Sequence, residues 1–304
     1  MSKTLKMCLL VALFTIVSIV PAFAGTFTDE SGRTVTVPDK PERIVALSPW
    51  VVEILFALDY PPVGRPSSAV YPEAALQVEA HGTSYRLNYE RIMALRPDLI
   101  IGNNNLHRAF LDQLASINAP VLLYDIDSYQ DVLEKVTILG QITGRTEEAA
   151  KINADLEARL AKLTSKLPKK KLTAVVLVGS AEAFSVAKGN SYIGNQLKIL
   201  GVENIGDRGP EHRPGYTRLS LEYIAQANPD VIFAVKPEVD PNNPTSALDG
   251  YDKNPLWGSL AAVQNGRVYE LDPVISFMNP GPRIIDSLEF MAQCLYPEVF
   301  TGEK

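Results

Sequence analysis

The sequence predicts an α/β fold of two similar lobes, each with a parallel-rich sheet flanked by helices, joined by one long bridging helix. The main observation is a repeat. Residues 88–101 and 220–233 share one pattern: a short amphipathic helix, a Pro-Asp pair and an apolar strand. Proline ends each helix because it lacks an N–H and disfavours helical backbone in the residue before it. Helix-forming residues fill 129–167, between the copies. Copies so far apart indicate two lobes of domain size rather than a solenoid.

The first lobe is predicted from alternating strand and helix patterns. Residues 25–43 predict a β-hairpin, because Thr, Val and Phe alternate around an Asp-Glu-Ser-Gly turn. Apolar β-branched runs predict buried parallel strands, and the segments between them predict helices on both faces of the sheet. Beyond the first repeat copy, strands are expected at 43–47, 62–65 and 119–124, and helices at 51–58 and 108–117.

The bridging helix follows two glycines that divide the helix-forming run. Its expected span is 146–167, roughly 33 Å at 1.5 Å per residue, with Thr146 as N-cap. The second lobe then repeats the order of the first. Its expected elements are a strand at 172–178, a helix and strand within 195–206, the second repeat copy, a helix at 255–263, a strand at 267–271 and a helix at 283–295, with loops at 207–218, 236–250 and 272–282.

The N-terminus has the features of a secretory signal. A basic start precedes an apolar run at 9–20 and a small-x-small site ending at Ala24. The run is too short for a membrane anchor. Cleavage after Ala24 would remove Cys8 and leave Cys294 as the only cysteine, so no intramolecular disulfide is expected; the reactivity of Cys294 stays open. The predicted division is a signal peptide at 1–24, a first lobe at 25–143, the bridging helix at 144–168 and a second lobe at 169–304.

Composition limits the partners. The 304 residues are 46% hydrophobic and 21% charged, as in a globular protein with a substantial core. The formal net charge is −6, which argues against a nucleic-acid partner. No nucleophile elbow, P-loop or dinucleotide-binding glycine motif is present. The three histidines, His81, His107 and His212, have no spacing typical of a metal site. A bare-metal binder, an exported enzyme and a surface-binding scaffold remain as alternatives.

Aromatic, amide and basic residues gather in the loops that follow the predicted strands. In open α/β sheets, ligands bind at the carboxyl ends of the strands, so these loops predict a cleft between the lobes. Such a lining suits a large, partly apolar ligand with peripheral negative charge. The candidate ligand-binding residues are Trp50, Tyr71, Tyr85, Arg86, Asn104 and His107 from the first lobe, and Tyr192, Arg213, Tyr216, Phe277 and Met278 from the second.

These features together resemble a known family. The signal, the Arg-Ile-Val-Ala-Leu-Ser-Pro segment at 43–49, Val63-Gly64, Tyr71-Pro72, the paired Glu-x-Ile…Pro-Asp-x-Ile segments and the bridging helix are similar to periplasmic substrate-binding proteins of ABC importers for ferric siderophores, haem and cobalamin. The resemblance covers about residues 26–298. It implies a monomeric periplasmic carrier without enzymatic activity or a resident cofactor, with a small metal complex held between the lobes.

The resemblance also implies partners and roles. Glu90 and Glu222 match the glutamates, one per lobe, that dock the family's proteins on the ABC permease, which works with an ATPase. Ferric siderophore ranks first as ligand, haem second and a corrinoid such as cobalamin third, because Ser84-Tyr85 replaces the tryptophan of cobalamin binders. If the ligand is haem, Tyr71 is the candidate iron ligand. The rigid bridging helix implies a small change in lobe angle on binding.

Overall fold

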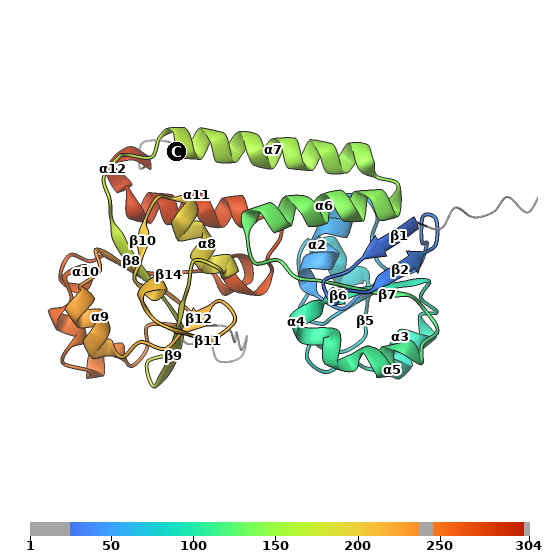
Figure 1. Ribbon diagram of the computed structural model, residues 1–304, viewed down its shortest axis with the longest axis horizontal. Coiled ribbons are helices and arrows are strands. Elements are labelled where there is room, and N and C mark those ends of the chain that lie inside the picture. The colour runs from blue at the N-terminus through green and yellow to red at the C-terminus, as the bar shows by residue number, and fades with distance from the viewer. Residues whose placement is uncertain (1–24, 237–245, 301–304) are drawn as a thin grey trace, which may run out of the picture.

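The computed structural model describes residues 25–236 and 246–300. The predicted signal and its cleavage site lie outside these residues. Two lobes stand side by side, and the helix α7 runs along one side of both (Figure 1). This arrangement confirms the predicted α/β class and two-lobed plan. Within the described part of the chain, no helix combines the length and the apolar character needed to cross a membrane.

The first lobe is built on a five-stranded sheet in the order β5-β4-β3-β6-β7, with every pair parallel. A separate antiparallel hairpin, β1–β2, precedes it. The elements are β1 (Gly25–Thr28), β2 (Thr34–Val37), β3 (Ile44–Ala46), α2 (Pro49–Ala57), β4 (Gly64–Arg65), η1 (Glu73–Gln77), β5 (Glu79–Ala80), α3 (Tyr89–Ala94), β6 (Leu99–Asn103), α4 (Asn104–His107), η2 (Arg108–Phe110), α5 (Leu111–Ala115) and β7 (Val121–Tyr124).

The second lobe has a seven-stranded mixed sheet, ordered β11-β12-β9-β8-β13-β14, with β10 paired to the start of β8. Its elements are β8 (Thr173–Ser180), β9 (Ala183–Ala187), α8 (Tyr192–Ile199), β10 (Glu203–Asn204), η3 (Ile205–Arg208), β11 (Glu211–Arg213), β12 (Tyr216–Thr217), α9 (Leu221–Ala227), β13 (Val231–Val235), η4 (Tyr251–Lys253), η5 (Trp257–Ser259), α10 (Ala261–Gln264), β14 (Val268–Glu270), the π-helical turn η6 (Val274–Met278), α11 (Ile284–Leu295) and α12 (Pro297–Phe300).

Two consecutive helices join the lobes, α6 (Tyr129–Thr143) and α7 (Thr146–Ser165). Gly144 ends α6 in a left-handed conformation (φ 69°), as a glycine C-cap does. The apolar face of α7 supplies Leu156 and Leu163 to a hydrophobic core cluster that runs through both lobes. The N-cap of α7 is Arg145, so the predicted Thr146 cap is wrong: Thr146 is already helical.

The two repeat copies form equivalent structures. Asn88 and Ser220 cap α3 and α9 by accepting hydrogen bonds from backbone N–H groups three residues later. The aspartate after each proline anchors the start of a strand inside its sheet, β3 in the first lobe and β8 in the second. Asp98 accepts hydrogen bonds from the backbone N–H groups of residues 42 and 43, and Asp230 accepts one from the N–H of Thr173. The repeat therefore fixes where each central strand begins.

Three local predictions differ from the structure. The second lobe contains an antiparallel β8–β9 hairpin extended by β12 and β11, where only parallel strands and loops were expected. The expected helix at 255–263 is divided into η5 and α10, and the expected loop at 272–282 contains the turn η6.

Glycine is required at one position of the β8–β9 hairpin. Gly179 is in the left-handed region at φ 128°, where β8 and β9 pair closely, and a side chain there would meet the Ala183 carbonyl.

A buried ion pair connects the lobes directly. The Glu53 carboxylate on α2 accepts two hydrogen bonds from the Arg283 guanidinium just before α11, at 2.8 and 3.0 Å. The Glu53 side chain is 3% exposed. Burial raises the pKa of Glu53, and the interactions with Arg283 offset part of that effect. The Tyr71 ring covers the guanidinium at 3.8 Å, a cation–π distance.

Cys294, the cysteine within the described residues, is chemically quiet. Cys294 is buried on α11, and burial raises the pKa of its thiol to about 11. Since the thiolate is the reactive form, Cys294 is protonated and poorly reactive at neutral pH.

The Glu53–Arg283 pair gives a stability prediction. Glu53→Gln should lower the free energy of unfolding by roughly 3 kcal/mol, because it leaves a guanidinium that is only 16% exposed without its counter-charge. The exposed pair Glu203–Arg208 provides the control, and Glu203→Gln should cost less than about 1 kcal/mol. Urea denaturation followed by circular dichroism measures both, and equal small losses would contradict the assignment.

Candidate functional site

A cleft of about 380 Å³ lies between the lobes, at the carboxyl ends of their strands. Its volume is within the range of small-molecule sites. Aromatic, hydroxyl and amide groups dominate its surface. The lining residues are Ser48, Pro49, Trp50, Ser68, Ser84, Tyr85, Asn103, Asn105, Leu106, Ile126, Asp127, Ser191, Tyr192, Arg213, Pro214, Tyr216, Phe277, Met278 and Pro280.

The N-terminus of α2 forms part of the first-lobe wall. Ser48 follows β3 and is the N-cap of α2, but its hydroxyl makes no capping hydrogen bond. The Ser48 Oγ and the Trp50 Nε1 are both buried without a hydrogen-bond partner in the described structure. Buried polar atoms are nearly always paired in native proteins, so these two groups are candidates to bond a ligand after a small adjustment.

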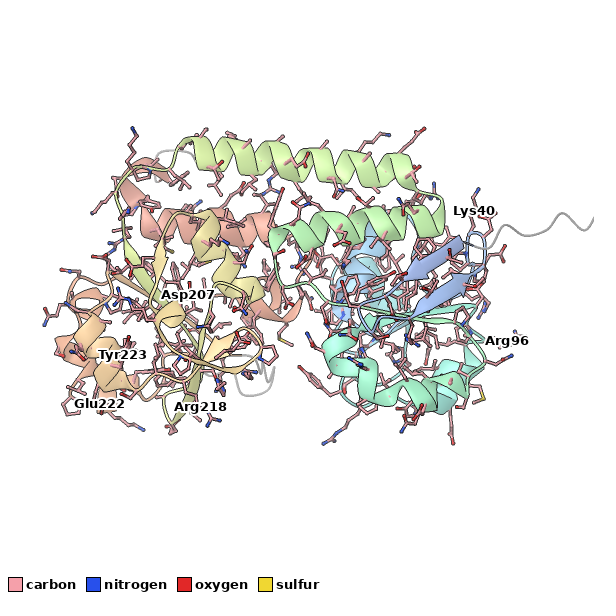
Figure 2. The ribbon with its side chains drawn as sticks, viewed as in Figure 1. Lys40, Arg96, Asp207, Arg218, Glu222 and Tyr223 are labelled. Carbon is pink, nitrogen blue, oxygen red and sulfur yellow. The ribbon has the colours of Figure 1, made fainter. Side chains whose placement is uncertain are left out.

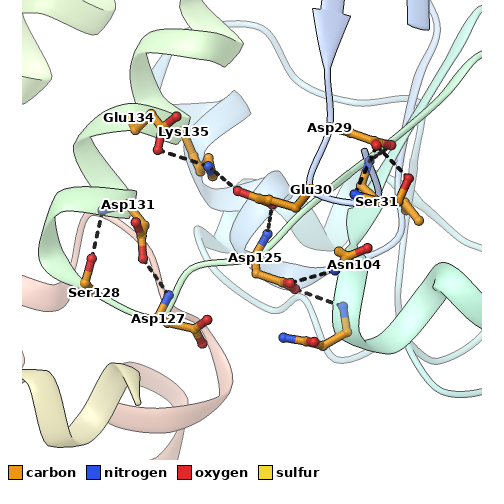
Figure 3. A network of polar contacts seen from close by, with 12 residues as sticks. Asp29, Glu30, Ser31, Asn104, Asp125, Asp127, Ser128, Asp131, Glu134 and Lys135 are labelled. Atoms are coloured by element: carbon orange, nitrogen blue, oxygen red, sulfur yellow. Dashed lines mark hydrogen bonds and ion pairs between the residues drawn. The ribbon is translucent and has the colours of Figure 1, made fainter. Parts of the chain in front are cut away.

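A polar network joins the β1–β2 hairpin, the segment after β7 and the N-terminus of α4 (Figure 3). The Asp125 carboxylate accepts hydrogen bonds from the Asn104 side-chain amide (3.0 Å) and the backbone N–H of Asn105 (2.9 Å). Glu30, in the turn of the β1–β2 hairpin, accepts a hydrogen bond from the Asp125 N–H and forms a 2.6 Å ion pair with Lys135. The hairpin thereby fixes the N-terminus of α4, which presents Asn105 to the cleft.

Asp127 follows this network and faces the cleft. Its backbone N–H donates to the Asp131 carboxylate at 3.0 Å, while its own carboxylate accepts none of the hydrogen bonds drawn in Figure 3. Although solvent reaches the side chain through the open cleft, the surrounding protein raises the pKa of Asp127 to about 6, and the charges of Asp125, Asp131 and Glu30 add to the effect.

The second-lobe wall is aromatic. The Arg213 guanidinium lies over the Tyr216 ring at 3.9 Å, and the Tyr216 and Phe277 rings meet edge to face with centroids 6.4 Å apart. Tyr192 is buried in the first turn of α8, where its hydroxyl donates to the Ile275 carbonyl at 3.5 Å. Burial raises the pKa of Tyr216 to about 12 and keeps the phenol protonated.

The structure brings seven of the eleven predicted binding residues to the cleft. They are Trp50, Tyr85, Tyr192, Arg213, Tyr216, Phe277 and Met278. The other four do not line it. Arg86 is exposed beside Tyr85 but outside the lining. Asn104 points its amide nitrogen at Asp125, and its neighbours Asn103 and Asn105 line the cleft instead.

His107 is a structural residue. It is fully buried, its Nδ1 accepts a hydrogen bond from the Asn103 N–H, and its Nε2 lies 2.9 Å from the Ser84 carbonyl. The Nε2 therefore carries the proton and donates it. Burial lowers the pKa of His107, so the ring is neutral with both nitrogens occupied. His107 positions the Ser84 and Asn103 loops rather than contacting a ligand.

Tyr71 is also misplaced by the sequence prediction. It lies behind the cleft, where its ring covers the Arg283 side of the ion pair between the lobes, and it contributes to a separate surface cavity with α7. Tyr71 is therefore outside the cleft in which it was expected to coordinate haem iron.

Among the charged and hydroxyl residues of the cleft, sequence reasoning missed Asp127 and the serines Ser48, Ser68, Ser84 and Ser191. The rule that placed the others would have found Asp127, which comes three residues after the end of β7. The serines gave no such indication, because small hydroxyl residues are common in every loop. Ser48 and Ser191 occupy matching places as N-caps of α2 and α8.

Two α/β lobes that enclose a ligand-sized cleft and share a bridging helix define the class of extracytoplasmic solute-binding proteins. The family model described as "Periplasmic binding protein" matches residues 44–275, which is more than half of the chain. The protein belongs to this family.

Curated relatives and solved structures agree with this family assignment. The chain is 28% identical to the Fe(3+)-citrate-binding protein YfmC of Bacillus subtilis, over 80% of this chain and 77% of YfmC. It is 27% identical to the high-affinity heme uptake system protein IsdE of Staphylococcus aureus, over 76% of this chain and 80% of IsdE. A crystal structure of an ABC transporter substrate-binding protein from Listeria monocytogenes superposes with a TM-score of 0.74 at 28% identity, covering 85% of this chain and 99% of that one.

The raised pKa of Asp127 predicts a pH-dependent stability difference. Between the ordinary value near pH 4 and about pH 6, the folded state binds a proton that the unfolded state has released. The Asp127 contribution to stability therefore falls as pH rises through this window. Asp127→Asn should be more stable than the parent at neutral pH, and the difference should vanish towards about pH 4. Urea midpoints measured across this range test it, and a pH-independent difference would contradict it.

Proposed function

We propose that this protein binds an iron complex, a ferric siderophore first and haem second, and delivers it to an ABC permease in the cell envelope. The observation that carries the proposal is the aromatic cleft between the lobes of a chain that belongs to the periplasmic binding protein family. The relatives support iron as the cargo, because their names specify Fe(3+)-citrate and heme. The protein then acts as a monomeric periplasmic carrier that performs no chemistry on its ligand.

The aromatic side chains of the cleft provide contact area for a ligand and can orient it. Tyr85 is 73% exposed although aromatic, so it is free to cover a ligand from the first lobe. Phe277 and Tyr216 face it from the second lobe. Aromatic faces of this kind supply large contact area at low entropy cost. Haem remains the second candidate because Tyr85 and Met278 carry phenol and thioether groups, both of which ligate haem iron in proteins.

Two exposed glutamates support docking on a permease. Glu90 on α3 and Glu222 on α9 belong to equivalent helices, and both helices lie on the side of the molecule opposite α7 (Figure 1). Figure 2 shows Glu222 and Tyr223 at the outer end of the second lobe. Hydrogen bonds from its own backbone N–H and from the Ser220 hydroxyl lower the pKa of Glu222, which keeps it ionised. An acid on each lobe suits recognition by basic residues of a two-fold partner.

Ligand titration tests the cleft. In a Trp257→Phe background Trp50 is the only tryptophan, and ferric siderophore, haemin or cobalamin should quench its emission on binding. Tyr85→Ala should weaken binding roughly tenfold, because it removes an aromatic contact from the cleft lining. Tyr223→Ala, on α9, is the matched control and should bind like the parent. Tyr71→Phe should also bind normally, since Tyr71 lies outside the cleft.

The titration has a clear contrary result. A folded protein that binds no member of this panel would overturn the proposed iron cargo and restore the bare-metal and scaffold alternatives.

Charge reversal tests docking. Glu90→Arg and Glu222→Arg should each reduce uptake of the labelled iron complex by about tenfold through its ABC importer, because a repelled rim contact slows encounter and weakens the complex. Ligand affinity should stay within about twofold of the parent, since neither residue lines the cleft. Glu147→Arg, on α7, is the control and should transport normally. Normal uptake by both docking variants would refute this role.

A further inference from the structure

We infer that the cleft selects iron complexes of zero or positive net charge, and that Asp127 is the residue that discriminates against polyanionic complexes. This inference rests on the proposed function and adds the charge class of the ligand. A ferric trihydroxamate is neutral because three hydroxamate anions balance Fe(III), whereas a ferric tris-catecholate is a trianion. The structure favours the first kind of complex over the second.

The cleft lining carries little charge. Among the described residues that form its surface, Asp127 of the first lobe is the only carboxylate, and Arg213 of the second lobe is the only basic side chain. The sequence predicted two guanidiniums for this lining, those of Arg86 and Arg213. Arg86, however, is exposed outside the lining. A polyanion bound between the lobes would therefore meet a single cation, and that cation already lies against the Tyr216 ring.

Further acidic residues lie behind the first-lobe wall of the cleft. Figure 3 shows an acidic cluster in which Asp125, Asp131 and Glu30 surround the Asp127 segment. Lys135 is the base in this cluster, and its ammonium is already paired with Glu30 and Glu134 at 2.6 and 3.2 Å. The wall is net negative as a result, and the unpaired Asp127 carboxylate extends that negative field into the cleft.

Among the described residues, the rest of the cleft surface is polar or apolar but carries no charged group. The cleft presents four serine hydroxyls, two asparagine side chains and five aromatic rings, all uncharged at neutral pH. They are Ser48, Ser68, Ser84, Ser191, Asn103, Asn105, Trp50, Tyr85, Tyr192, Tyr216 and Phe277. Hydroxyl and amide groups bond the carbonyl and N–O oxygens of a neutral chelate, and rings cover its apolar backbone. These groups can donate hydrogen bonds to an anion, but none supplies the positive charge that would offset the desolvation of several negative charges.

The test compares complexes that differ in charge alone as far as chemistry permits. Gallium(III) or iron(III) is presented on one tripodal backbone bearing three hydroxamates (neutral) or three catecholates (trianionic). Ferrioxamine B serves as a cationic trihydroxamate. Calorimetry or Trp50 fluorescence gives Kd for each. The neutral and cationic complexes should bind at least about tenfold more tightly than the trianion, and concentrated salt should narrow the difference by screening.

Variants assign the discrimination to its residue. Asp127→Asn should improve trianion binding several-fold and leave the neutral complex within about twofold, whereas Asp127→Glu should keep the parent preference. Arg213→Gln should weaken the trianion further. Glu147→Gln removes one negative charge from α7 instead, and it should leave every Kd unchanged. A structural role of Asp127 would alter all three complexes alike, so this pattern distinguishes the two roles.

The outcomes separate the two claims. Tightest binding of the trianion, or equal effects of Asp127→Asn and Glu147→Gln, would overturn the charge selection and leave the proposed function standing. Failure of the folded protein to bind any of the three complexes, haemin or cobalamin would remove the proposed function and this inference with it.

Discussion

The arrangement of the two walls depends on the buried ion pair between Glu53 and Arg283. Glu53 lies one turn after Trp50 on α2, and Arg283 comes five residues after Met278, so the pair joins the two segments that face each other across the cleft. Breaking it would leave an uncompensated buried charge, which is far more costly than losing a surface pair. With Tyr71 stacked on the guanidinium, the connection between the lobes is short, polar and specific in direction.

The hydrophobic core continues through both lobes, so it also holds them in a fixed relative position. Leu55 of α2, Leu156 of α7 and Leu288 of α11 belong to one hydrophobic cluster. A relative rotation of the lobes must therefore disturb apolar packing as well as the ion pair, since protein interiors are close-packed and do not deform continuously. We therefore expect the binding cleft to be largely formed before a ligand arrives, which lowers the entropy cost of binding.

Much of this plan could be predicted from the sequence because it depends on local rules. The Pro-Asp pairs at 97–98 and 229–230 stop a helix and anchor a strand in both lobes. The residues Trp50, Tyr216 and Phe277 were placed by the rule that ligands bind at the carboxyl ends of strands. The rule succeeded for Trp50, four residues after β3, but not for Asn104, which directly follows β6 and bonds Asp125 instead.

The wrong predictions for individual site residues have a different origin. They depend on contacts between residues that are far apart in the sequence. Nothing near His107 shows that the Ser84 carbonyl will accept its proton, and nothing near Tyr71 shows that Arg283 will lie beneath its ring. The shortage of cations in the cleft is likewise visible only once the loops are folded. The most direct test of the account is an anomalous difference map from crystals grown with a ferric trihydroxamate. The account predicts one iron peak between Trp50 and Tyr216. An iron peak elsewhere, with this cleft empty, would contradict it.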